Sequence, residues 1–270
     1  MKNATSKSSL VRLLAAGALV SGMFAASGAM ACTVDNWSSA SGVTAGDPAA
    51  DGISRYQGLC GLEVTGSGYV QDNSPAGIDR IVARFYVLND NTAPATIYSG
   101  FSANDATGEV FNVTLDDAGQ VTLTDTATGQ TVSQSGSTDW LSVEIDWVRD
   151  ASGSISLSVN GQAAAEATGF DNTGASQLAS VQLGNLDGAA GTLGFDSYES
   201  RRSTAVGRVC VGDADPSGER DFADLTAIFG ELVGGSLASG TPDATEDGII
   251  DFDDVTAIFG VIVGGQGECP

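Results

Sequence analysis

Histidine is absent from this sequence of 270 residues, and its 11 Lys and Arg residues are outnumbered by 34 Asp and Glu residues. The absence of histidine excludes imidazole-dependent catalytic triads and imidazole metal ligands. The formal net charge of −23 argues against nucleic-acid binding, because phosphates require Lys and Arg. The same charge argues against adsorption to anionic membrane surfaces, which repel an acidic protein.

A convincing membrane-spanning run is also lacking. The apolar stretch at residues 13–26 is interrupted by glycine and serine and is too short to cross a bilayer as a helix. Basic residues precede it, and Ala29-Met30-Ala31 supplies the small residues of a cleavage site. This order is typical of a secretory signal peptide. We therefore predict a signal peptide over residues 1–31 and a secreted or cell-surface protein with no transmembrane segment.

Only four cysteines occur, and they form two widely separated sets, Cys32 with Cys60 and Cys210 with Cys269. Four cysteines allow three pairings. The most economical pairing closes each set on itself and requires an oxidising compartment. Cleavage after residue 31 would leave Cys32 first, which raises a lipid anchor as an alternative. Ala29, rather than Leu, lies three residues before this cysteine, so the anchor is the less favoured reading.

Two near-copies of an acidic segment, 30 residues apart, close the chain. Residues 213–224 are DADPSGERDFAD and residues 243–254 are DATEDGIIDFDD, and the motif TAIFG follows each after one apolar residue. Oxygen-bearing side chains fall at loop positions 1, 3, 5, 9 and 12, and glycine at position 6 permits a sharp turn. Calcium requires six to eight oxygen ligands. The repeat therefore predicts two calcium loops, with metal-free acidic turns as the weaker alternative.

The repeat resembles the dockerin module of cellulosomal and related secreted proteins, which carries two such loops, each followed by a helix and closed by Asp. The resemblance implies two Ca²⁺ sites, in which position 7 contributes its backbone carbonyl. The first site would comprise Asp213, Asp215, Ser217, Glu219, Asp221 and Asp224. The second would comprise Asp243, Thr245, Asp247, Ile249, Asp251 and Asp254.

Three departures from the dockerin pattern qualify this resemblance. Thr245 replaces the usual Asn or Asp, so the second site should be weaker. Arg220 occupies a position that is usually aliphatic, as Ile250 is in the second loop. Phe222-Ala223 and Phe252-Asp253 replace the small hydroxyl pair that helps dockerins choose a cohesin partner. Calcium binding is therefore the stronger expectation, and a cohesin-like or envelope partner the weaker one.

Apolar residues recur at helical spacing after each acidic loop. The pattern predicts that two helices pack through Leu225, Ile228, Phe229 and Leu232 of one and Val255, Ile258, Phe259 and Ile262 of the other. A module of this kind, over residues 207–270, should be only marginally folded without calcium.

The middle of the chain alternates apolar and polar residues over short runs separated by Gly, Asn and Asp, which predicts strands. The clearest runs are residues 78–88, 96–103, 110–115, 121–124, 140–147, 154–160, 179–183 and 193–200. About ten strands within residues 32–204 is the size of a two-sheet jelly roll. We therefore predict an all-β sandwich, a short flexible tether at 203–207, and the helical calcium module.

Two motifs of this region resemble a secreted lamin-G-like, concanavalin-type jelly roll. The run 80–87 is RIVARFYV, and residues 194–202 are GFDSYESRR, similar to the closing motif of that family. The resemblance covers roughly residues 65–202. Relatives of such domains bind glycans or proteins, and a minority cleave polysaccharides.

Candidate ligand-binding residues lie on the strand predicted at 140–147. Trp140, Glu144 and Asp146 share one face, because side chains alternate along a strand. Trp140 is the best exposed candidate for stacking on a sugar, whereas Trp147 alternates with core residues. Glu144 and Asp146 are similar to the start of the catalytic strand of family-16 glycoside hydrolases, but the final glutamate of that motif is missing.

No catalytic residue is therefore assigned, and an enzyme is the less favoured class. The leading hypothesis is a non-catalytic extracellular protein whose jelly roll binds a glycan and whose calcium module attaches it to a scaffold or the cell envelope. A polysaccharide hydrolase or lyase carrying a dockerin is the first alternative. A purely structural exoprotein, with the repeat as a stable cap, is the second.

Overall fold

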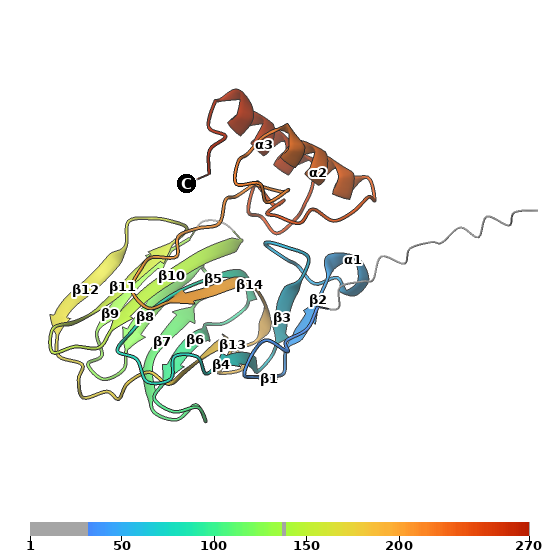
Figure 1. Ribbon diagram of the computed structural model, residues 1–270. Coiled ribbons are helices and arrows are strands. Elements are labelled where there is room, and N and C mark those ends of the chain that lie inside the picture. Colours follow the sequence, from blue (N-terminus) through green and yellow to red (C-terminus); the bar gives the residue numbers. More distant parts are fainter. Residues whose placement is uncertain (1–31, 137–138, 270) are drawn as a thin grey trace, which may run out of the picture. The chain divides into compact units, whose positions relative to one another are not determined.

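Two antiparallel sheets of seven strands each form a jelly-roll sandwich in the computed structural model, which describes residues 32–136 and 139–269 (Figure 1). The first sheet has the order β1 (Ser39–Ser41), β4 (Gly68–Asp72), β13 (Ser180–Asn185), β6 (Ala95–Phe101), β7 (Glu109–Leu115), β8 (Gln120–Asp125) and β9 (Thr131–Ser135). The second sheet has the order β12 (Ala165–Phe170), β11 (Gly153–Val159), β10 (Trp140–Val148), β5 (Arg80–Asn91), β14 (Gly191–Arg201), β3 (Gly61–Thr65) and β2 (Thr44–Gly46).

The eight strands predicted from alternation are all present, and their ends differ from the prediction by at most three residues. The expected total of about ten was too low, since β1 to β4, β9 and β12 were missed. Four of the missed strands, β1, β2, β9 and β12, lie at sheet edges. Strand β9 has one buried residue and β12 has none, so their sequences lack the alternation that marks a half-buried strand.

The core lies between the sheets and is built from alternate residues of the central strands. On β5, Ile81 and Phe85 are fully buried there, and Trp147 of β10 packs among them, as predicted. The indole Nε1 of Trp147 donates a hydrogen bond of 2.9 Å to Asp125, which also accepts one from Asn172. The intervening residues of β5 and β10 therefore lie on the outer face of the second sheet.

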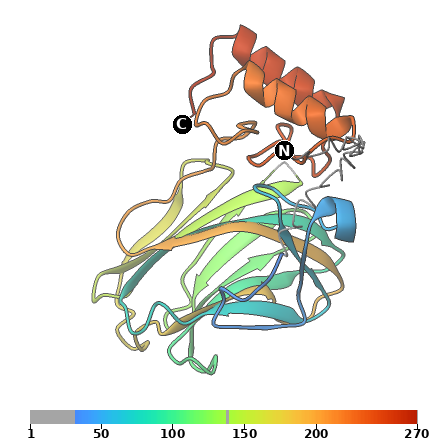
Figure 2. The same cartoon turned by 45° about the vertical axis from the view of Figure 1, so that its right-hand side comes forward.

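The described part of the chain contains one short helix, α1 (Pro48–Asp51), and two longer ones, α2 (Phe222–Leu232) and α3 (Phe252–Val263). Helices α2 and α3 begin at capping boxes: the N-caps Asp221 and Asp251 each accept a backbone N–H of the first turn. Figure 2 shows α2 and α3 lying side by side. None of the described helices is long and apolar enough to cross a membrane.

The packing of α2 against α3 differs from the prediction at its two phenylalanines. Ile228 and Ile258 are buried as expected, with the other predicted aliphatic residues half-buried around them. Phe229 and Phe259, however, are 48% and 50% exposed. Ala214 and Ala238 from the loops complete this small core instead, so the larger aromatic rings remain on the surface.

Substitutions on the two helices should therefore fall into two groups. With calcium present, Ile228→Ala and Ile258→Ala should each lower the free energy of unfolding by about 2–5 kcal/mol, because each removes a buried side chain. Phe229→Ser and Phe259→Ser should each lower it by less than about 1 kcal/mol. Urea denaturation followed by circular dichroism measures both groups, and equal losses in the two would contradict the packing described.

Two disulfides join Cys32 to Cys60 and Cys210 to Cys269, which is the economical pairing. The second closes a segment of 59 residues that contains both acidic loops and both long helices. Loop closure of this length stabilises a fold by roughly 4 kcal/mol in the chain-entropy model. The predicted signal peptide, residues 1–31, lies outside the described residues.

Candidate functional site

The first acidic loop gathers three carboxylates around one point. Oxygens of Asp213, Asp215 and Asp224 all lie within 4.8 Å of one another. Asp224, fully buried at the start of α2, accepts backbone hydrogen bonds from Ala214 at 2.8 Å and from Asp221 at 2.7 Å. The last residue of the loop is thereby folded back onto its first half, which is the arrangement that a calcium loop requires.

The second acidic loop repeats this geometry. Asp254 is fully buried and accepts backbone hydrogen bonds from Ala244 at 2.8 Å and from Asp251 at 2.8 Å. Asp243 accepts one from Gly248 at 2.9 Å, as its counterpart Asp213 does from glycine at the same loop position. That glycine has a φ of +88° in the first loop and +82° in the second, so a side chain there would strain the turn.

Four buried aspartates of these loops, Asp213, Asp224, Asp243 and Asp254, form no ion pair with an arginine in the described parts of the chain. The other buried carboxylate of the second loop, Glu246, pairs with Arg208. Burial raises the pKa of Asp224 and Asp254, and it raises the pKa of Asp243 to about 7. A divalent cation would supply the missing positive charge and restore the ionised form. The residues present therefore fit a calcium ion chemically.

The remaining predicted ligands lie in the same two loops. The hydroxyl of Ser217 donates to the Glu219 carbonyl at 3.2 Å, which places two predicted oxygen ligands together. Thr245 bonds through its hydroxyl to Asp254 at 3.1 Å. The others are the helix N-caps Asp221 and Asp251, and Asp247 with Ile249, which are joined by a hydrogen bond from the Ile249 amide. Their coordination of a metal stays a prediction.

Arg220, the departure from the dockerin pattern, has a structural role in this chain. Its guanidinium donates to the carbonyls of Gln266 and Glu268, each at 2.8 Å, and its amide bonds to Gly267. It therefore holds the C-terminal tail beside the first loop. Its counterpart Ile250 instead packs against the small core of the helices.

The outer face of the second sheet is not the exposed surface that the sequence suggested. Trp140 shares this face with Glu144 and Asp146, as expected, but it is fully buried, so the prediction that it is exposed was wrong. Tyr56 packs edge-on against its ring at a centroid distance of 5.5 Å, and Tyr86 completes the cluster. The surrounding chain segments thus cover this indole and keep it from stacking on a sugar.

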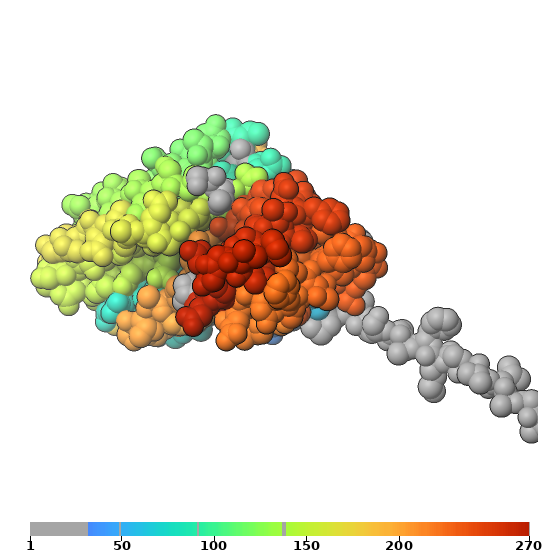
Figure 3. Space-filling view, turned by 90° about the horizontal axis from the view of Figure 1, so that it is seen from above, coloured from blue at the N-terminus to red at the C-terminus, as the bar shows by residue number. Residues whose placement is uncertain are grey.

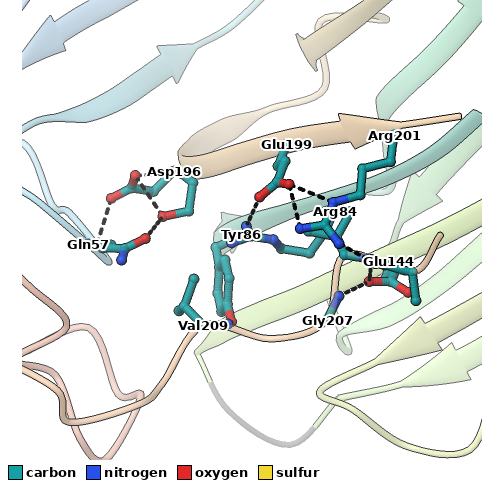
Figure 4. Close-up of polar contacts among 12 residues, drawn as sticks. Gln57, Arg84, Tyr86, Glu144, Asp196, Glu199, Arg201, Gly207 and Val209 are labelled. Atoms are coloured by element: carbon teal, nitrogen blue, oxygen red, sulfur yellow. Dashed lines mark hydrogen bonds and ion pairs between the residues drawn. The ribbon is translucent and has the colours of Figure 1, made fainter. Parts of the chain in front are cut away.

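Glu144 and Asp146 already have partners on this face. Asp146 accepts two hydrogen bonds from Arg80, at 3.0 and 2.7 Å. Glu144 accepts the backbone amides of Val206 and Gly207, at 3.1 and 2.6 Å, and Figure 4 shows this contact with Gly207. The segment expected to be a flexible tether is therefore attached to the sheet.

Asp196 of β14, in the closing motif, joins the sandwich to the loop that follows α1. Its carboxylate accepts the amide of Tyr56 at 2.6 Å and that of Gln57 at 2.9 Å. Figure 4 shows Asp196 beside Gln57. Burial raises its pKa from 3.8 to about 6, against the effect of these hydrogen bonds. Neither residue spacing nor composition distinguished Asp196 from the other acids, since its burial depends on contacts across 140 residues of sequence.

The raised pKa of Asp196 predicts a pH-dependent stability. Because its folded pKa of about 6 exceeds the unfolded value of 3.8, the folded state binds the proton more tightly between these values. The free energy of unfolding should therefore fall as pH rises from about 4 to about 6.5, by up to about 3 kcal/mol from this group at about 1.4 kcal/mol per pKa unit. Urea denaturation at several pH values with saturating calcium measures it, and Asp196→Asn is the reference. Parallel pH profiles for the two chains would contradict the prediction.

Comparisons with known proteins give likenesses of fold only. No family model matches this chain, and no curated relative matches it. A solved endo-β-1,4-glucuronan lyase from the fungus Trichoderma reesei is 9% identical with a TM-score of 0.46, and the match covers 64% of this chain and 93% of that one. The cellulose-induced protein Cip1 is 13% identical with a TM-score of 0.43, and the match covers 66% of this chain and 93% of that one. The receptor-binding domain of botulinum neurotoxin type G is 13% identical with a TM-score of 0.37, and the match covers 60% of this chain and 44% of that one. At such TM-scores, no conclusion about the activity of this chain follows from them.

Proposed function

We propose that this is a secreted, non-catalytic, calcium-binding protein whose jelly roll binds a glycan and whose C-terminal module attaches it to a scaffold or envelope partner. The observation that carries the calcium part is the pair of matching loops in which Asp213 and Asp224, and likewise Asp243 and Asp254, are buried without an arginine partner among the described residues. In the first loop Asp215 joins the cluster. The two-sheet sandwich with a polar outer face supports the glycan part. The surface of α2 and α3 supports the attachment part.

Calcium titration of the full chain tests the first part. After removal of bound metal, isothermal titration with Ca²⁺ should reveal two sites, the second weaker because Thr245 supplies no carboxylate at position 3. Asp224→Ala should abolish the tighter site and Asp254→Ala the weaker one. Asp253→Ala, which removes an exposed acid next to Asp254, should leave both sites intact. Binding that is insensitive to Asp224→Ala would overturn the assignment.

The attachment surface that we propose is the phenylalanine face, defined as Phe222, Phe229, Phe252 and Phe259. These four side chains are 48–63% exposed, and the rings of Phe229 and Phe252 lie 6.1 Å apart. In Figure 3 the two helices that carry them, in orange and red, lie at the surface. Exposed apolar patches of this kind mark protein interaction sites.

Retention of the full chain on envelope fractions in calcium tests this surface. Phe229→Ser combined with Phe259→Ser should abolish retention, whereas the stability of the double variant should remain close to that of the parent. Retention that survives the double substitution would exclude the phenylalanine face. A second predicted partner, a cohesin-like domain, is tested in the same format with purified cohesins.

Retention on a panel of soluble and insoluble polysaccharides tests the glycan part. Retention without new reducing ends or unsaturated products supports a lectin-like module. New reducing ends or unsaturated products would instead support the hydrolase or lyase alternative, and loss of that activity in Glu144→Gln would assign Glu144. Neither retention nor products would favour the structural exoprotein.

A further inference from the structure

Four polar side chains lie together on the outer face of the second sheet, and we call this group the Arg84 face. They are Arg84 and Tyr86 of β5, Glu144 of β10 and Arg201 of β14 (Figure 4). In the strand register, Arg84 of β5 lies opposite Glu144 of β10 on one side. On the other side it lies opposite Glu199 of β14. Side chains that are opposite each other in neighbouring strands lie within contact distance. Three adjacent strands therefore present these groups together.

A segment of the same chain, residues 205–209, lies across this face; we call it the strap. Its backbone groups make the hydrogen bonds to this face, and the side chain of Val209 packs against the cluster that contains Tyr86. Arg201 donates to the Ala205 carbonyl at 2.6 Å, Glu144 accepts two successive amides, and the Tyr86 hydroxyl accepts the Val209 amide at 3.0 Å. Groups of the Arg84 face therefore bind the backbone of a segment that is neither strand nor helix.

The strap does not satisfy the whole face. Arg84 is only 5% exposed, yet its Nε and Nη1 have no hydrogen-bond partner among the described residues. It forms an ion pair with Glu199, at 3.3 Å, and its guanidinium lies 5.5 Å from the centre of the Tyr86 ring. Buried donors without partners are costly. An external ligand with acceptor groups above Arg84 would therefore match this face better than the strap does.

The second acidic loop holds the strap in place through Glu246. The carboxylate of Glu246 accepts hydrogen bonds from Tyr56 at 2.6 Å and from Arg208 of the strap. Its backbone carbonyl accepts the amide of Trp140 at 3.1 Å. Because Glu246 lies between Asp243 and Asp247, any ordering of that loop by a bound ion would also fix the strap.

We infer that the Arg84 face is the saccharide-binding site of the jelly roll and that the strap is a built-in competitor, which the second acidic loop keeps closed. This inference rests on the proposed glycan-binding function and names its site and regulation. A saccharide offers neighbouring hydroxyls in place of the two amides on Glu144, and hydroxyl oxygens as acceptors for Arg84. The net charge of −23 repels polyanions, which points to a neutral saccharide.

The test uses the full chain in calcium with neutral hexasaccharides of β-1,4-glucan, β-1,3-glucan, β-1,4-xylan and β-1,4-mannan. Hydrogen exchange over residues 203–209, measured by mass spectrometry, reports on the strap, and isothermal titration gives the affinity. A hexasaccharide that binds the parent should accelerate exchange in the strap. Glu246→Ala should tighten its binding by about tenfold, since a larger fraction of molecules is then open. Asp117→Ala, an exposed acid in a turn of the first sheet, is the matched control and should change neither quantity.

The outcomes separate this inference from the function on which it rests. Hexasaccharide binding with unchanged strap exchange and equal affinity in Glu246→Ala overturns the inference and leaves glycan binding intact. Absence of binding to both chains overturns both. Binding of oligouronates alone overturns the neutral class, and binding only of a synthetic peptide spanning 203–210 makes the face a peptide site. If Glu246→Ala does not fold, Arg208→Ala replaces it in the affinity comparison, because Arg208 is the strap partner of Glu246. The exchange measurement on the parent requires neither variant.

Discussion

Removal of calcium with EDTA should unfold residues 207–270 and leave the β sandwich folded. Asp213, Asp224, Asp243 and Asp254 are each at most 8% exposed, and no arginine pairs with them in the described residues. Without a cation, their mutual repulsion and desolvation oppose folding of both loops. Since Asp224 and Asp254 lie in the first turns of α2 and α3, the helices should be lost with the loops.

Far-ultraviolet circular dichroism measures this loss as a decrease in the helical signal at 222 nm, and hydrogen exchange localises it. Added Ca²⁺ should restore the signal. Asp224→Ala should have a reduced helical signal at 222 nm even in calcium, because its first loop cannot bind the ion. Asp253→Ala should give the same signal as the parent. A spectrum that is the same with and without EDTA would refute the calcium dependence.

Replacement of Arg55 by methionine should lower the free energy of unfolding by about 3–5 kcal/mol, because it leaves a buried charge without its partner. The guanidinium of Arg55 is fully buried and pairs at 2.7 Å with Glu231 of α2, whose side chain is 11% exposed. Glu231 also accepts the Ala238 amide at 2.7 Å, and Arg55 donates to the Gly58 carbonyl. This pair therefore joins the loop after α1 to the helical module.

Arg80→Ala is the matched control, since the ion pair of Arg80 with Asp146 has side chains that are 40% and 28% exposed. Its loss should cost at most about 1 kcal/mol, because water already screens the pair. Replacing both partners, as Arg55→Met with Glu231→Leu, should recover much of the stability that Arg55→Met loses. Urea denaturation in calcium measures all three chains, and equal losses for Arg55→Met and Arg80→Ala would contradict a buried linkage.

The contacts of the loop after α1 should also transmit the loss of calcium to the outer face of the second sheet. Tyr56 and Gly58, close to Arg55, bond to Glu246 and Gly240 in the C-terminal part of the chain. Residues 32–270 form one compact unit. Loss of calcium should therefore weaken the contacts that cover Trp140 and the Arg84 face, although the sandwich core lies on the other side of the sheet.

Local features of this protein followed from the sequence by itself. Alternation located eight strands, because a half-buried strand must place apolar residues on one side. The spacing of oxygens and glycine identified two acidic loops, because glycine adopts the positive φ of a sharp turn at little steric cost. The economical disulfide pairing is the observed one. Each of these depends on residues that are near one another in the chain, or on a small number of alternatives.

Which faces are covered was decided only by the tertiary structure. Trp140 looked like an exposed aromatic and is buried, whereas Phe229 looked like core and is half exposed. The contacts responsible join residues far apart in sequence, such as Tyr56 with Glu246, 190 residues apart. The periodicity of apolar residues indicates which side chains share a face of a strand or helix. Whether that face is buried depends on the segments that pack against it. Here a strap and an acidic loop cover the polar face of a sheet, and no local pattern encodes that arrangement.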